Sequence, residues 1–286
     1  MSTFLTTQGD PKRWNDLRKR ALSAAVLLPA AVACIWLGAT PFAAMMALAG
    51  AILTWEWVHL CGRRLRALPG VVVPLVVLAA GAFAVVDHVR IALTVLAAGF
   101  VATWIFARWR PDGLTQSARR LALGVLYIGL AGLALIELRH DTEAGRANVL
   151  FLFVIVWASD IGAYAAGRLF GGPKLAPAIS PNKTWSGAIG GLVAAVVLGL
   201  TCALSFTPGA ATGAVVAVAV LLSVASQAGD LLESGIKRHF KVKDASSLIP
   251  GHGGLLDRLD GVLAAAPVAA LLSFALGHGR PLWGWG

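Results

Sequence analysis

Apolar and polar positions alternate along this chain in long blocks. Nine apolar blocks approach the length that a helix needs to cross a hydrocarbon core of about 30 Å: residues 21–38, 41–58, 70–86, 91–107, 121–137, 149–167, 185–206, 210–228 and 262–277. Because a backbone in lipid must satisfy its own hydrogen bonds, each block predicts a membrane-spanning helix. We therefore expect an all-α, polytopic integral membrane protein with about nine transmembrane helices, in which residues 1–286 form a single membrane-embedded domain.

The composition excludes several other classes of protein. Hydrophobic residues make up 58% of the chain and charged residues 13%, and the mean hydropathy is +0.76. A soluble domain has about 25% charged residues, so disorder, a coiled coil, collagen and a water-soluble enzyme are excluded. The three cysteines have no metal-ligand spacing, and we interpret them as packing residues.

The basic residues predict an orientation. The net charge of +10 would suggest nucleic acid as a partner in a soluble protein, but here we expect none. If nine spans begin with the N-terminus inside, twenty Lys and Arg residues fall on the inner segments and four on the outer ones. Since cytoplasmic loops carry the excess of Lys and Arg, we expect a cytoplasmic N-terminus.

The first apolar block has a second interpretation. Basic residues precede it, as in a signal peptide, but it is long and another block follows at once, so we expect a retained helix. No organelle signal stands out, and we expect a multi-pass protein of the bacterial inner (plasma) membrane. Two longer inner loops, about 168–184 and 229–261, are rich in polar residues, Gly and Pro, which is typical of functional loops.

Asp160 lies within the sixth apolar block, about two turns before its inner end. A charge at the bilayer centre costs about 2.5–3.5 kcal/mol on insertion scales, so such a residue usually faces a cavity or a partner. The alternative is a structural ion pair with a basic residue.

A second group of polar residues follows the eighth block. If the helix continues there, Asp230, Glu233, Ser234 and Lys237 share one face, because they are three, four and seven positions apart. The alternative is a solvated amphipathic helix lying on the membrane.

Asp257, Arg258 and Asp260 open the ninth block, and the two Asp residues are at i and i+3. Carboxylate oxygens suit a hard cation such as Mg²⁺, which also bridges substrate phosphates. The alternative is simple capping of a helix N-terminus by acidic residues. His252 stands among glycines that permit the backbone to present N–H groups to an anion, although a plain flexible turn is also compatible with this pattern.

Ser180, Lys183 and Thr184 stand immediately before the seventh block, where a helix N-terminus with Lys and hydroxyl groups can bind phosphate. The alternative is ordinary snorkelling of Lys at a membrane edge. By topology, all these polar groups lie on the inner leaflet. That arrangement favours a metal-assisted reaction between a phosphorylated, water-soluble donor and a lipid acceptor.

The last inner loop carries a recognisable motif. It reads S-x-x-K-R from Ser234 to Arg238, then Lys243-Asp244, and H-G-G-x-x-D-R-x-D from His252 to Asp260. It resembles the signature of the phosphatidate cytidylyltransferase (CDP-diacylglycerol synthase) family. Ser159-Asp160 and the stretch from Ser180 to Trp185 are also similar, so that the motifs cover about residues 158–261. Asn182 stands where the family often has a second Lys.

The resemblance implies that CTP and phosphatidic acid react to give CDP-diacylglycerol and pyrophosphate. It implies catalytic roles for Asp230, Asp257, Asp260 and Lys237, with the three Asp residues holding Mg²⁺ and a monovalent cation such as K⁺ beside it. It also implies a homodimer embedded in the lipid bilayer. The residues implied in substrate and phosphate binding are Asp160, Ser180, Lys183, Thr184, Ser234, Arg238, Lys243, His252 and Arg258.

Three alternatives remain open at this stage. A related CTP-dependent cytidylyltransferase or kinase would act on a polyprenol or an archaeal lipid. A secondary transporter would use Asp160, Asp230 and Asp260 as a cation site. A lipid-binding scaffold protein would need no such motif.

Overall fold

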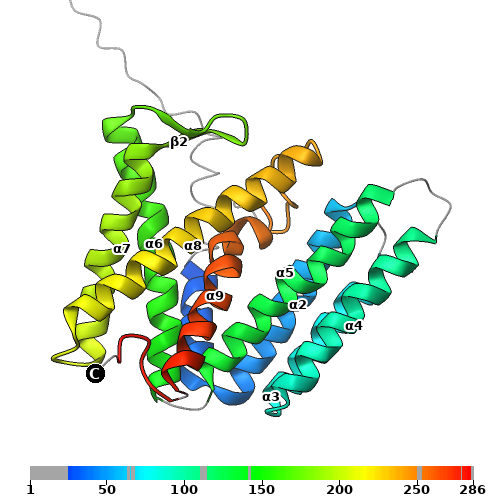
Figure 1. Ribbon diagram of the computed structural model, residues 1–286, viewed down its shortest axis with the longest axis horizontal. Coiled ribbons are helices and arrows are strands. Elements are labelled where there is room, and N and C mark those ends of the chain that lie inside the picture. The colour runs from blue at the N-terminus through cyan, green and yellow to red at the C-terminus, as the bar shows by residue number, and fades with distance from the viewer. Residues whose placement is uncertain are drawn as a thin grey trace, which may run out of the picture.

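The protein is a bundle of long helices with one small hairpin (Figure 1). The computed structural model describes residues 25–62, 65, 68–109, 115–140, 143–249, 253–277 and 279–284. A helical segment, Ala25–Leu37, comes first. It is followed by α2 (Ala39–Leu60), α3 (Val72–Val85), α4 (Val89–Arg108), α5 (Thr115–Arg139), α6 (Glu143–Phe170), β1 (Lys174–Ala176), β2 (Ser180–Thr184), α7 (Trp185–Phe206), α8 (Thr212–His239) and α9 (Leu256–Leu276).

The expected fold class, an all-α polytopic membrane protein, is confirmed. Among the described residues, seven helices are long and apolar enough to cross a membrane, and they lie in α2 and in α4 to α9. Two further apolar helices, Ala25–Leu37 and Val72–Val85, are shorter than 18 residues. The count of nine spans, the single domain and the cytoplasmic N-terminus stay predictions.

Two helices extend well beyond their apolar blocks. Helix α8 continues to His239, whereas the block was expected to end at 228, and α9 begins at Leu256 instead of 262. The hypothesis that the eighth helix continues is therefore confirmed, and Asp230, Glu233, Ser234 and Lys237 all lie on α8. Hydropathy alone places the end of α8 too early and the start of α9 too late, because the polar residues beside the blocks are compensated by partners on other helices.

The predicted loop at 168–184 is mostly an antiparallel hairpin. Strands β1 and β2 pair with Lys174 opposite Thr184 and Ala176 opposite Ser180. Thr184 ends β2 and caps α7, since its hydroxyl accepts a hydrogen bond from the Gly187 N–H at 3.1 Å. A Thr cap stabilises a helix start by about 1 kcal/mol, so the hairpin and α7 are joined rigidly.

Helices α6 and α7 approach each other through small residues. A Cβ added to Gly162 would lie 2.5 Å from the Ala194 Cβ, and one added to Gly191 would lie 2.6 Å from the Ser159 carbonyl oxygen. Such distances are below real contacts, so glycine is required for this close packing. Near the crossing, the Ser159 and Ser223 hydroxyls lie 3.0 Å apart and tie α6 to α8.

The first helical segment is fastened to α5 by one side chain. Arg139 is nearly buried, and its Nε donates to the Ile35 carbonyl at 2.6 Å, while its Nη2 lies 3.5 Å from the Trp36 carbonyl. These are carbonyls at the end of a helix, which have no partner within their own helix.

Helix α9 lies between two apolar cores. One core includes Phe151, Leu222 and Trp283 and lies mainly among α6, α7, α8 and the C-terminal segment, whereas the other includes Trp57 and Leu121 and lies among α2 to α5. Figure 1 shows α6 and α7 on one side and α3 and α4 on the other, with α9 between them. The hairpin, the end of α8 and the start of α9 point to the same end of the bundle, which we call the loop end.

Candidate active site

Three aspartates from three helices lie within electrostatic range of one another near the loop end. Asp160 on α6 interacts electrostatically with Asp260 on α9 and with Asp230 on α8, and Asp260 in turn interacts with Asp230. We call Asp160, Asp230 and Asp260 the carboxylate cluster. Their separation in sequence exceeds any helical repeat, so only the packing of α6, α8 and α9 brings them together.

The hairpin contributes a cation to this cluster. The Lys183 ammonium on β2 forms a close ion pair with the Asp230 carboxylate, and both side chains are about one third exposed. The Ser234 hydroxyl, one turn along α8, donates to the same carboxylate at 3.4 Å. Lys183, Asp230 and Ser234, all predicted as site residues, are therefore brought together.

Lys237 joins α8 to the start of α9. Its Nζ lies 2.7 Å from Asp257 Oδ1 and 3.4 Å from Glu233 Oε1. Glu233 is fully buried, and removing the cation from a buried pair costs about 3–5 kcal/mol. Lys237 thus holds the polar end of α8 against α9.

Asp257 organises the loop that precedes α9. Its Oδ2 accepts hydrogen bonds from the Ala245 and Gly254 N–H groups, both at 2.9 Å, while its Oδ1 faces Lys237. The side chain is only 4% exposed. Both carboxylate oxygens of Asp257 therefore already have donors within the protein, and these contacts hold the loop against α8 and α9. The predicted role of Asp257 as a metal ligand stays a prediction.

The cluster has the chemistry that Mg²⁺ requires. Among the described residues, no group of three His, Cys, Asp or Glu side chains stands ready at metal-binding geometry. However, three carboxylates lie within electrostatic range of one another there, and buried Glu233 interacts with both Asp260 and Lys237 beside them. Since Mg²⁺ is commonly bound by one or two carboxylates plus substrate phosphates and water, the donor set fits this ion.

The remaining predicted residues lie around the rim. Arg258 is exposed and acts electrostatically on Asp160, and Arg238 is exposed with its Nε 3.4 Å from the Ile179 carbonyl of the hairpin turn. Lys243 is exposed, and Ser180 is partly buried at the start of β2. Thr184 is buried in its capping role, and its phosphate role stays a prediction. His252 lies outside the described residues.

Glu56 is a site residue that the sequence patterns did not reveal. It lies on α2 with no solvent exposure. Its Oε1 accepts from the Ser246 hydroxyl at 2.6 Å and from the Leu255 N–H at 2.9 Å, and its Oε2 accepts from the Leu256 N–H at 2.7 Å. A carboxylate at a helix N-terminus is favoured by the helix dipole, so Glu56 fixes both the loop and the first turn of α9.

The space beside Glu56 explains a glycine of the motif. A Cβ on Gly254 would lie 2.7 Å from Glu56 Oε1. The only local signal for Glu56 was a single carboxylate between Trp55 and Trp57 within an apolar block, which is costly unless the charge has partners.

Comparison with known proteins identifies the family of the chain. A model of the cytidylyltransferase family matches residues 18–276, which covers most of the chain and the whole carboxylate cluster. The chain belongs to the cytidylyltransferase family. The expected family and the expectation of a nucleotidyltransferase are thereby confirmed.

Two relatives resemble the chain over most of its length, and a third resembles about half of it. The phosphatidate cytidylyltransferase of Brucella suis is 40% identical over 259 residues, which cover 90% of this chain and 93% of the relative. That of Haemophilus influenzae is 36% identical over 288 residues, covering 90% and 99%. That of Staphylococcus saprophyticus is 41% identical over 150 residues, covering 52% and 56%. This cytidylyltransferase is therefore similar to bacterial membrane enzymes, whereas the predicted homodimer stays a prediction.

Proposed function

We propose that this cytidylyltransferase converts CTP and phosphatidic acid into CDP-diacylglycerol and pyrophosphate, as a step of phospholipid biosynthesis. The observation that carries the proposal is the carboxylate cluster with Lys183 and Lys237 at one end of a membrane-embedded bundle. The proposal is also supported by relatives at 36–40% identity, which are named phosphatidate cytidylyltransferase.

The reaction transfers a cytidylyl group between two anions. A phosphate oxygen of phosphatidic acid forms a new bond to the α-phosphorus of CTP, and the bond from that phosphorus to the bridging oxygen of the β-phosphate breaks. Pyrophosphate leaves with the electron pair. Because the attacking oxygen is already anionic, no strong general base is needed, and the barrier is dominated by charge repulsion and by orientation.

The chain's own residues supply charge and position. We assign Asp230 and Asp260 to holding Mg²⁺, with Asp160 completing the set and Asp257 acting chiefly on the loop. The ion would neutralise phosphate charge on CTP and on the leaving pyrophosphate. The ammonium of Lys183, which pairs with Asp230, lies where it can bind a substrate phosphate, while Lys237 keeps α8 and α9 in register.

The exposed rim suits a soluble nucleotide. Arg238, Lys243 and Arg258 are exposed at the loop end and can attract the triphosphate of CTP from water. The lipid reaches the same site from the bilayer. CTP is made and used in the cytosol, so we place the loop end on the cytoplasmic face of the bacterial inner membrane.

The decisive test is pyrophosphate release by the detergent-purified protein. The complete mixture contains CTP, Mg²⁺ and phosphatidic acid, and each component is omitted in turn. We expect release only from the complete mixture, with a CDP-lipid detected by mass spectrometry. Parallel reactions with polyprenyl phosphate and with an archaeal ether-lipid phosphate identify the acceptor.

Variants connect the activity to the cluster. Asp260→Asn and Asp230→Asn are expected to lower turnover at least a hundredfold without loss of folded, monodisperse protein. The matched control is Asp87→Asn, because Asp87 is an exposed aspartate outside the cluster whose carboxylate lies 3.2 Å from the His140 ring nitrogen. Normal Mg²⁺-dependent turnover by Asp260→Asn would contradict the metal assignment, and turnover with a different lipid phosphate alone would replace the substrate.

A further inference from the structure

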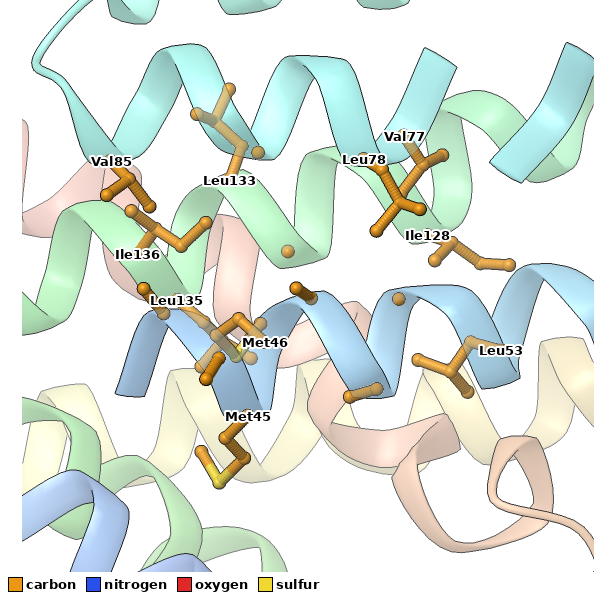
Figure 2. A pocket seen from close by; sticks show the side chains of 18 of the residues that line it. Met45, Met46, Leu53, Val77, Leu78, Val85, Ile128, Leu133, Leu135 and Ile136 are labelled. Atoms are coloured by element: carbon orange, nitrogen blue, oxygen red, sulfur yellow. The ribbon is translucent and has the colours of Figure 1, made fainter. Parts of the chain in front are cut away.

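A large apolar cavity lies within the bundle and extends to the part of α9 that carries Asp260. Its volume is about 760 Å³, within the range of small-molecule sites. It is bounded mainly by α2, α3, α5 and α9. Figure 2 shows Met45, Met46, Val85 and Ile136 toward one end, and Leu53 and other aliphatic side chains toward the other.

The side chains that line the cavity favour a hydrocarbon ligand. Every lining residue is aliphatic, aromatic, Met or Gly except Thr40. Along α2 the cavity extends from Thr40 to Leu53, which at 1.5 Å per residue is roughly 20 Å. One leaflet of a bilayer core is about 15 Å deep, so the cavity has the length and the chemistry of a single lipid chain.

The cavity is open toward the bilayer. Six of its lining residues are exposed on the outside of the bundle, on α2, on α3 and at the end of α3: Thr40, Ala44, Ala47, Ala82, Val85 and Val86. Three of them lie on α2, which is long and apolar enough to cross a membrane, so a lipid chain can reach the cavity from the bilayer.

Its inner part borders the site. Leu259 lines the cavity and directly precedes Asp260 of the carboxylate cluster. Ile128 also lines it, and the neighbouring Tyr127 hydroxyl donates to the Asp260 carbonyl at 3.5 Å. A chain lying in the cavity would thus pack against the part of α9 that carries a cluster aspartate.

We propose that this cavity binds one acyl chain of the lipid phosphate acceptor and so sets the depth of its phosphate at the carboxylate cluster. The proposal rests on the proposed function, because it assumes that the acceptor is a lipid. It assigns acceptor-chain recognition to α2, α3 and α5, whereas the polar groups of α6, α8, α9 and the hairpin recognise phosphate.

The glycines of the wall permit a clean test. A Cβ on Gly132 of α5 would meet no atom within 4 Å, so Gly132→Leu fills the cavity without an initial clash. The matched control is Gly213→Leu in the first turn of α8, since Gly213 also has open space and does not line the cavity. Leu is a better helix former than Gly, so neither change weakens its helix.

The assay compares long-chain phosphatidic acid with a six-carbon, water-soluble form. For Gly132→Leu we expect kcat/KM to fall at least tenfold for the long-chain lipid, with the short-chain value and the KM for CTP unchanged. Gly213→Leu should match the parent with both lipids. An equal loss for both lipids, or no loss for either, would overturn the proposal.

A binding measurement separates this proposal from the proposed function. Phosphatidic acid with a diazirine at the end of one chain is cross-linked to the parent protein, and the labelled peptides are mapped. We expect labels at Met45, Met46 or 128–136, lost in Gly132→Leu and competed by phosphatidic acid. Equal competition by phosphatidylcholine would overturn the proposal. Labelling of the cavity without turnover of CTP would instead refute the proposed reaction and leave the proposed acyl-chain site supported.

Discussion

Replacing Glu56 by Gln tests whether a residue on α2 controls the loop before α9. In Glu56→Gln, one side-chain oxygen can keep its hydrogen bonds to Ser246 and Leu255, but an NH₂ group replaces the oxygen that accepts from the Leu256 N–H. The variant therefore has two donors facing each other in a fully buried place.

The magnitude follows from these three bonds. A buried donor without a partner costs about 1–3 kcal/mol, and each of the two remaining bonds weakens by about 1 kcal/mol when the acceptor loses its charge. Burial of a neutral amide is easier than burial of a carboxylate, which offsets part of this loss. The net effect on docking of the loop is about 1–3 kcal/mol, or roughly a five- to hundredfold shift in the docked population.

Two assays measure the shift. Lys241 and Lys243 are exposed within the loop, so trypsin should cleave there faster in Glu56→Gln, and kcat should fall by a similar factor. Ser246→Ala removes one bond and should have a smaller effect, and the double variant should be less than additive. Thr54→Val is the control, since Thr54 is buried on the same helix and its hydroxyl donates to the Gly50 and Ala51 carbonyls of its own helix.

Two results for Glu56→Gln would refute a positioning role for Glu56. If Glu56→Gln had parental turnover and parental cleavage at the loop, Glu56 would not position the site. If it lost thermal stability as much as activity, with the loop still protected from trypsin, its role would be general packing and not positioning.

Three further predictions concern the contacts around the site. Lys237→Met should lower the free energy of unfolding by about 3–5 kcal/mol, because it removes the cation that Glu233 and Asp257 share. Adding Glu233→Gln should restore part of the melting temperature, and an unchanged melting temperature in Lys237→Met would contradict this prediction. Thr184→Val should cost about 1 kcal/mol through loss of the α7 cap, measured by thermal unfolding, and a raised KM for CTP at parental stability would instead assign the hydroxyl to substrate. Gly191→Ala should cost about 1–3 kcal/mol by forcing α6 and α7 apart, whereas Gly213→Ala should be tolerated, and size-exclusion profiles with melting curves compare the two.

Part of the candidate site could be predicted because it depends on local geometry. Residues three or four apart on a helix share a face, and this alone placed Glu233 beside Lys237 on α8 and Asp230 beside Ser234. The motif before α9 identified the loop that carries Asp257, because its residue types and spacing are specific.

The grouping of the aspartates could not be predicted in the same way. Asp257 and Asp260 are at i and i+3 and were expected to act together, yet Asp257 is held by Lys237 and by loop N–H groups, while Asp260 interacts with Asp160 and Asp230. Which carboxylate faces which depends on the rotation of α9 against α6 and α8, and rotation is set by packing.

The sequence by itself determined the membrane-embedded, all-helical class, because a lipid-exposed backbone has no other way to satisfy its hydrogen bonds. It also identified the charged residues within apolar blocks, whose burial in lipid costs free energy unless they have partners. Only the tertiary structure decided that Glu56 caps α9 from 199 and 200 residues away, and that α2, α3, α5 and α9 leave a cavity between them. Both arise from contacts between helices distant in the chain, and such contacts leave no periodic signal in either segment alone.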